Sequence, residues 1–153
     1  MQIQGTVNIE AQQQHVWTCL LDPQALSECT PGLESWHALQ APNSYEIVLV
    51  RHLSAKRSVR VPVMIKWVLI IPPTHLDLNL ATTLNNQIVS ASGQMILKPV
   101  MEQHTALDFS LVLNTPNRMF LQMLGNMLPT IVEQFFQCVK ARLETKTAVS
   151  PPH

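Results

Sequence analysis

The sequence has few charged residues, and their two signs balance. Charged side chains make up 13% of the 153 residues, with ten basic and ten acidic groups and a formal net charge of zero. A nucleic-acid-binding domain needs a marked basic excess, so the composition argues against a nucleic-acid partner. Hydrophobic residues reach 46%, which gives a chain of this length ample material for the core of one domain.

Cysteines are few and metal-binding motifs are absent. The three cysteines, Cys19, Cys29 and Cys138, are odd in number and show no metal-type pairing. Such a set is typical of a reduced, cytoplasmic protein rather than a disulfide scaffold. None of the histidines falls in a zinc-type motif, and the sequence contains no glycine-rich phosphate loop or nucleophile elbow. We therefore expect no metal, no cofactor and no catalytic residue.

Long apolar runs are also missing. The longest, residues 67–73, is far shorter than the about 20 residues of a transmembrane helix. Residues 1–5 alternate polar and apolar side chains, with no basic region before an apolar run, so we expect no signal peptide. The predicted location is the cytoplasm.

What the sequence does contain is a succession of alternating segments. Period-two patterns predict strands at 2–10, 33–40, 45–53, 59–71, 75–83, 87–98 and 104–114. In segment 59–71 every odd position is apolar, which assigns those side chains to the inward face. The turns between the last six strands are short, so neighbouring strands should be antiparallel. Two short helices, 11–21 and 24–29, are expected between the first two strands.

The longest element is one amphipathic helix from Thr115 to about Lys146. Thr115 is the expected N-cap, with Pro116 at the first helical position. At about 1.5 Å per residue this helix is about 45 Å long, which suits lying across a broad sheet. Pro129 predicts a bend that either wraps the sheet or leaves a cavity beneath. The predicted apolar stripe is Phe120, Leu124, Met127, Leu128, Ile131, Phe135 and Cys138, and the predicted polar face is Arg118, Gln122, Asn126, Thr130, Glu133, Gln137, Lys140 and Glu144.

These elements predict an α+β fold of one domain, residues 1–147. A seven-stranded curved antiparallel sheet would wrap around the long C-terminal helix, with two short helices after the first strand. Residues 148–153 are expected to be a disordered tail.

The N-terminal part resembles the carbon monoxide dehydrogenase G-subunit family. The residues that carry the resemblance are 1–7 (MQIQGTV), 16–17 (VW), 21–23 (LDP) and 29–35 (CTPGLES). Segment 51–60 lacks the glycines usual in that family. The order of the predicted elements is similar to that of the START-like, birch-pollen-allergen-like helix-grip superfamily (SRPBCC), to which this family belongs and which also contains polyketide cyclases.

The resemblance implies a helix-grip domain that holds a hydrophobic small molecule between sheet and helix. A lipid, a quinone or another apolar ring compound would fit. It also implies an accessory role for a membrane-linked redox enzyme, with peripheral contact at the inner membrane face.

The inward-facing apolar residues are the candidates for lining such a cavity. They are Val63, Ile65, Trp67, Leu78, Met95, Phe109, Leu111, Phe120, Met123, Leu124, Met127 and Ile131. Methionines adapt to varied ligands, and here Met64, Met95, Met119, Met123 and Met127 are either pocket residues or ordinary core filler. Alternation places His37 on the face of Leu33, Ser35 and Leu39, so it is the candidate polar group of the cavity.

Three functions stay open. The favoured one is non-catalytic binding of an apolar ligand. The second is a polyketide cyclase-type enzyme with His37 or another polar cavity group as acid or base. The third is a pure protein-interaction module. The basic run Arg51, Lys56, Arg57 and Arg60 is either a solvated hairpin tip or a contact for anionic lipids or an acidic partner.

Overall fold

The structure, a computed structural model, describes residues 1–149 except 85 and 116, without the side chains of 51–53, 84, 120, 123, 124 and 146–149. The strands are β1 (Gln2–Ile9), β2 (Leu33–Ala38), β3 (Ser44–Ser54), β4 (Arg57–Ile71), β5 (His75–Leu84), β6 (Gln87–Met101) and β7 (His104–Asn114). The helices are α1 (Gln13–Leu21), α2 (Pro23–Cys29) and α3 (Arg118–Val149). The predicted tail falls at the end of this range, with residues 150–153 outside the described part. The single domain, 1–147, stays a prediction.

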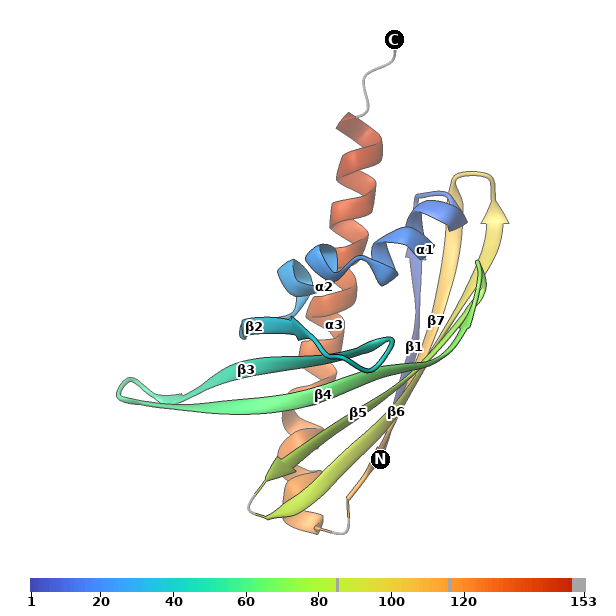
Figure 1. The fold of residues 1–153 in the computed structure, drawn as a ribbon. Helices are drawn as coiled ribbons and strands as arrows, with labels where there is room; N and C mark the ends of the chain where they lie inside the picture. The colour runs from blue at the N-terminus through green and yellow to red at the C-terminus, as the bar shows by residue number, and fades with distance from the viewer. Residues whose placement is uncertain (85, 116, 150–153) are drawn as a thin grey trace.

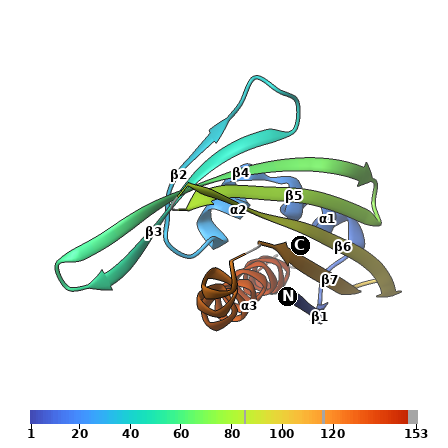
Figure 2. The same ribbon diagram turned by 90° about the horizontal axis from the view of Figure 1, so that it is seen from below.

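All seven strands form one antiparallel sheet in the order β1-β7-β6-β5-β4-β3-β2. Hairpins join the consecutive strands from β2 to β7, while β1 pairs with β7 at the opposite edge from β2. α1 and α2 carry the chain from one edge to the other (Figure 1). The sheet is curved, and α3 sits inside the curve when the molecule is seen from below (Figure 2). The predicted arrangement of a curved sheet around a long helix is confirmed.

Irregular pairing changes which side chains of β4 face α3. The β4–β5 register shifts between Trp67 and Leu69, so that Ile70 lies opposite the buried Leu76. Ile70 packs against the core, whereas Leu69 and Ile71 are 38% and 48% exposed. A β-bulge adds one residue to a strand and so reverses the faces of the residues beyond it. The predicted inward face of odd positions therefore ends at Trp67, and it is wrong for Leu69 and Ile71.

The closely packed core lies toward one end of the concave side. It is formed where α1, α2 and the C-terminal half of α3 meet the sheet. Its largest fully buried apolar side chains are Ile9, Val16, Leu20, Leu76, Leu97, Leu107 and Val139. α3 buries Phe136, Val139 and Leu143 most deeply, and the predicted stripe of Phe135 and Cys138 flanks that face as half-buried residues.

α3 begins two residues later than predicted, at Arg118 instead of Pro116. The side-chain Oδ1 of Asn117 accepts a hydrogen bond from the backbone N–H of Met119 (2.9 Å), so Asn117 rather than Thr115 caps the helix. The Asn117 Nδ2 also donates to Gln87 Oε1 (3.0 Å), which ties this end of α3 to the start of β6. The helix continues through Pro129. The predicted first residue, Pro116, lies outside the described residues.

Two charged side chains fasten the other half of α3 to the end of β1. Lys140 Nζ donates to the carbonyl oxygen of Asn8 (2.6 Å) and to Glu144 Oε2 (2.8 Å). The same carboxylate oxygen accepts from the backbone N–H of Glu10 (2.9 Å). Lys140 and Glu144 were predicted to face solvent with the polar residues of α3. The structure instead half-buries both, because β1 supplies backbone partners for their charges.

A disulfide joins the two helices that border the concave side. Cys29 of α2 is bonded to Cys138 of α3, with a Cα–Cα distance of 5.5 Å. Cys19 is buried and takes no part in this bond. The prediction that the cysteines are reduced is therefore wrong, since residues 109 positions apart in the chain carry no spacing signal. Disulfides persist mainly in oxidising compartments, so the cysteines no longer support the predicted cytoplasmic location.

Removing the disulfide should destabilise the protein. The cross-link closes a long loop in the unfolded chain, so we expect the Cys29→Ser/Cys138→Ser double variant to lose about 2–5 kcal/mol of unfolding free energy. Urea unfolding with and without reductant measures this loss, and the reductant should change the wild type only. A wild type that releases three thiols in denaturant without reductant would contradict the bond.

Because Glu144 accepts these hydrogen bonds as a carboxylate, the stability of the fold should decrease at acidic pH. Burial raises the pKa of Glu144, but the hydrogen bonds from Lys140 and the Glu10 N–H outweigh it, and the pKa lies below its ordinary value of 4.5. A folded-state pKa that is lowered adds stability above the unfolded value, and this stability is lost as the pH falls through the folded value. Glu144→Gln should cost about 1 kcal/mol at neutral pH and flatten the loss of stability below about pH 5.

Urea unfolding of the two proteins across this pH range checks the expectation. Glu133→Gln is the matched control, because Glu133 is exposed on the same helix. Equal acid sensitivity of wild type and Glu144→Gln would show that the Glu144 contact does not stabilise the fold.

Candidate functional site

Beyond the core, the concave side is lined by apolar side chains that stay partly accessible. Of the twelve predicted cavity residues, Trp67 and Met95 are buried. The structure describes seven as half-buried, namely Val63, Ile65, Leu78, Phe109, Leu111, Met127 and Ile131. The side chains of Phe120, Met123 and Leu124 lie outside the described part. The described members thus come from both walls, the strands and α3, and we name this region the concave apolar face.

The described methionines divide between the concave apolar face and other parts of the molecule. Met95 is buried and Met127 is half-buried on the concave apolar face. Met64 and Met119 are 42% and 75% exposed, so neither fills the core. Met64 is paired opposite Glu46 on the outer side of the sheet.

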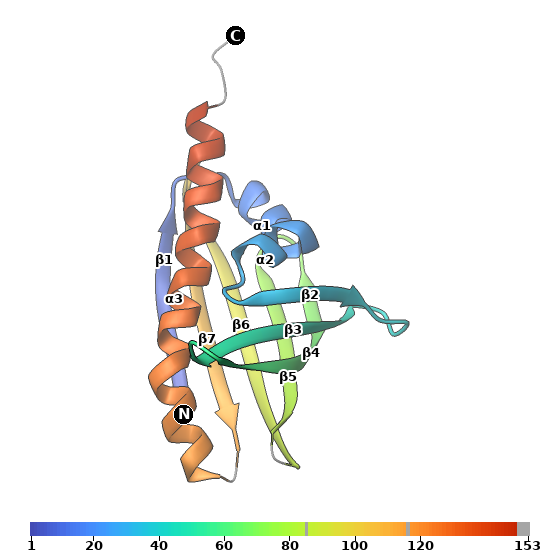
Figure 3. The same ribbon diagram turned by 90° about the vertical axis from the view of Figure 1, so that its left-hand side faces the viewer.

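One flank of α3 faces this region. Ile131, Phe135 and Cys138 follow one another at four- and three-residue spacing and so share a flank. Cys138 is bonded to Cys29 of α2, which fixes this flank toward α2. Figure 3 shows α2 and β2 beside α3, with β3 and β4 next to them. Ile131, one turn or more before the disulfide, therefore points toward the concave side below α2.

An aromatic cluster lies where the packed core meets the concave apolar face. The ring of Phe109 stacks on Phe136, with centroids 4.4 Å apart, and Phe135 meets Phe136 edge-on at 5.1 Å. The Phe109 ring also crosses β1 at Gly5, where a Cβ atom would come within 2.9 Å of the end of the ring. Gly5 is thus the small residue that lets this aromatic ring lie flat against the edge strand.

The structure places His37 on the outer side of the sheet, and its prediction as a cavity residue is wrong. The β2–β3 register shifts between Leu33 and Ser35. Beyond the shift, Trp36 lies opposite the buried Ile47, and the exposed His37 lies opposite Glu46. As in β4, a single irregular residue reverses the alternation that assigned the face.

Among the strand residues that the structure describes, no Asp, Glu or His takes the place of His37 on the inner side. The inward positions of the strands alternate with outward ones along the observed registers. Among the described residues, none of these inward strand positions is Asp, Glu or His. Within the described residues, the inward strand positions thus offer an acid–base mechanism no carboxylate or imidazole, and the phenol of Tyr45 is a polar group that remains there.

Two aromatic residues that the prediction left out belong to the inner side. Trp36 and Tyr45 are half-buried, pack against the core and lie with ring centroids 5.4 Å apart. Regular alternation from Leu33 had assigned Trp36 to the opposite face from His37. Only knowledge of the irregularity after Leu33 could have corrected both assignments.

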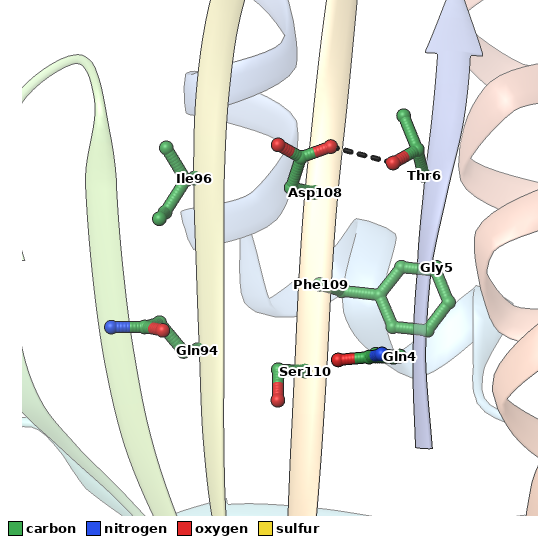
Figure 4. A pocket seen from close by; sticks show the side chains of 8 residues that line it. All are labelled: Gln4, Gly5, Thr6, Gln94, Ile96, Asp108, Phe109 and Ser110. Atoms are coloured by element: carbon green, nitrogen blue, oxygen red, sulfur yellow. Dashed lines mark hydrogen bonds between the residues drawn. The ribbon is translucent and has the colours of Figure 1, made fainter.

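A separate groove crosses the outer side of the sheet over β1, β6 and β7 (Figure 4). Its volume is about 470 Å³, and it is lined by Gln4, Gly5, Thr6, Gln94, Ile96, Asp108, Phe109 and Ser110. Lys98 Nζ lies 2.9 Å from Asp108 Oδ2, and Thr6 Oγ1 donates to Oδ1 (2.6 Å). The hydrogen bonds from Lys98 and Thr6 hold the pKa of Asp108 below its usual 3.8. This polar groove does not suit an apolar ligand.

The predicted basic run lies on the β3–β4 hairpin, which projects from the body of the sheet (Figure 1). Residues 54–60 are all exposed. Arg60 Nε donates to Glu34 Oε2 (2.7 Å), whereas Lys56 and Arg57 have no ion-pair partner within the described residues. The side chain of Arg51 lies outside the described part.

No three side chains of His, Cys, Asp or Glu come together as metal ligands in the part of the chain that the structure describes. Over the same residues, no helix combines the length and apolar composition that crossing a membrane requires.

Comparison with protein families gives one match that covers most of the chain. A family profile described as the carbon monoxide dehydrogenase G subunit (CoxG) matches residues 5–144. No curated protein matches the chain significantly.

Solved structures show the same fold. A conserved protein from Geobacillus kaustophilus has a TM-score of 0.82 and 22% identity, over 95% of this chain and 97% of its own. The ZhuI aromatase/cyclase from Streptomyces sp. R1128 has a TM-score of 0.66 and 15% identity, over 100% and 99%. A START superfamily protein from Mycobacterium smegmatis has a TM-score of 0.65 and 12% identity, over 94% and 97%. At these identities the likeness establishes a START-like fold.

Proposed function

Because the chain belongs to the CoxG family of carbon monoxide dehydrogenase G subunits, which confirms the resemblance in its N-terminal part, we propose that it binds an apolar small molecule between the sheet and α3. The observation that carries the proposal is the concave apolar face. Its half-buried side chains lie on both walls of one region, while the core beside it is closely packed. A lipid, a quinone or another apolar ring compound would cover these side chains.

The driving force is burial of apolar surface. Each Å² removed from water contributes about 25 cal/mol, reduced by the cost of association. Ligand pockets of this type are mostly apolar and carry few polar groups, and the inward strand positions fit that description. This apolar character favours carriage or presentation of the ligand over its chemical conversion.

The two alternatives differ in their support. His37 faces outward, so a cyclase-type enzyme would have to use another polar group of the cavity. One observation favours the protein-interaction module: the apolar side chains of Val68, Leu69 and Ile71 are exposed at the bulge of β4. The role as accessory to a membrane-linked redox enzyme is part of our proposal and is supported by the family name, as is the peripheral membrane contact. The cytoplasmic location stays a prediction.

A charge placed on the concave apolar face should abolish ligand binding. The neutral fluorophore N-phenyl-1-naphthylamine serves as the probe, and its emission rises when it leaves water. Ile131→Arg puts a guanidinium on the half-buried flank of α3, so we expect at least about tenfold weaker binding, or about 1.4 kcal/mol. Thr130→Arg is the matched control, because Thr130 is exposed one position earlier.

Either of two results of this titration would contradict the proposal. The first is a wild type with no saturable binding of the probe. The second is an Ile131→Arg variant that is folded and binds the probe as tightly as Thr130→Arg does.

The projecting hairpin should give weak attraction to anionic lipid. A basic residue near an anionic membrane contributes about 1 kcal/mol, and Lys56 and Arg57 are the unpaired charges whose side chains are described. In vesicle flotation we expect binding to phosphatidylserine vesicles at low salt, its loss in Lys56→Glu/Arg57→Glu, and its loss at high salt. Arg118→Glu at the exposed start of α3 is the control. Equal binding of both variants would exclude the hairpin as the membrane contact.

A further inference from the structure

One polar atom on the inner side of the sheet lacks a hydrogen-bond partner. The indole Nε1 of Trp36 is buried, and no described residue accepts its hydrogen bond. An indole N–H can only donate. Buried donors in folded proteins are almost always paired, and an exception calls for a missing partner. The residue itself is half-buried, so the indole lies at the boundary between packed and accessible regions.

Trp36 and Tyr45 form a pair at the edge of the concave apolar face. Trp36 lies opposite the buried Ile47, and Tyr45 lies opposite Ile65, a residue of that face. Their ring centroids are 5.4 Å apart with a tilt of 45° between the planes. Both rings touch the core cluster at its margin. The two residues therefore bring an indole N–H and a phenol hydroxyl to one part of an otherwise apolar wall.

The two groups differ in what they can offer. The Tyr45 hydroxyl can donate and accept, and within the described residues it makes no hydrogen bond. The Trp36 N–H is shielded from water as well as unpaired. A ligand with an acceptor oxygen would satisfy it, whereas a pure hydrocarbon would leave it unpaired and would gain nothing from either group.

We propose that Trp36 and Tyr45 are the polar recognition pair of the binding site, and that its ligand carries a hydrogen-bond acceptor such as a carbonyl oxygen on an apolar body. This inference rests on the proposed function, because it assigns the ligand class of the same site. Since the indole nitrogen is shielded without ligand, the Trp36 ring turns when the ligand enters and presents its N–H to the acceptor.

Two probes of nearly equal shape test the pair. 2-Acetylnaphthalene carries a carbonyl group, and 2-ethylnaphthalene has a methylene group in place of that carbonyl group. Titration calorimetry of the wild type should show about fivefold tighter binding of the ketone, as expected for one neutral hydrogen bond. Trp36→Phe keeps an aromatic ring but removes the N–H, so the ratio of its affinities for the two probes should fall to near one, whatever its affinity for 2-ethylnaphthalene.

Two further variants test whether the preference for the ketone arises on the inner side of the sheet. Tyr45→Phe should reduce the preference as well, and His37→Ala, on the outer side of the same strand as Trp36, should keep it in full. In the wild type, the ¹⁵N–¹H indole signal that is absent from Trp36→Phe spectra should move downfield with the ketone and not with 2-ethylnaphthalene. This signal reports a new hydrogen bond, which a purely structural role of Trp36 would not produce.

The outcomes separate the two proposals. Equal affinity of the wild type for both probes, or a preference that survives in Trp36→Phe, would overturn the recognition pair and leave the apolar site intact. Saturable binding of neither probe would overturn the proposed function, and the recognition pair with it.

Discussion

The way α3 is fastened decides what the rest of the structure can do. Its C-terminal half is held by the packing of Phe136 and Val139 in the core, by the Lys140 and Glu144 contacts with β1, and by the disulfide to α2. Its start is tied to β6 through Asn117. In the stretch between these anchors, the described inward side chains, among them Met127 and Ile131, are half-buried rather than fully buried. A helix held at both ends can thus form one wall of an apolar region without having to fill it.

The same constraint gives the concave side its two parts. Close packing beside α1 and α2 supplies the stability of the fold, since fully buried apolar side chains contribute most. The concave apolar face has the opposite character, because its side chains remain accessible to something that can enter. Apolar surface that the protein leaves accessible on an inner face is surface that a ligand can cover. This division is the physical basis for the binding function proposed here.

Much of the fold could be predicted from the sequence, because alternation and helical periodicity are local signals. Every predicted strand and helix is present, including the short helix that Asp22 caps and Pro23 begins. The faces were less predictable. One irregular residue near Glu34 moved His37 outward and Trp36 inward, and one at Val68 exposed Leu69. Neither position has a glycine or proline to mark it.

Long-range contacts could not be predicted from the sequence for another reason. The pairing of Cys29 with Cys138 depends on how α2 and α3 meet in space, and nothing near either cysteine reports it. The partners of Lys140 and Glu144 are backbone atoms of β1 and the residue after it, which side-chain patterns cannot reveal. By contrast, seven of the twelve predicted cavity residues lie half-buried on one concave face. Five of them lie on strands, where inward alternation holds wherever a strand is regular, and helical periodicity places Met127 and Ile131 on α3.

Native mass spectrometry of the purified protein, followed by denaturing extraction, is the most direct test of the central claim that α3 and the sheet enclose an apolar binding site. The account predicts a second species, heavier than the bare chain by the mass of one apolar molecule that the extraction then releases. A single species at the mass of the bare chain, unchanged after incubation with lipids and quinones, would contradict it.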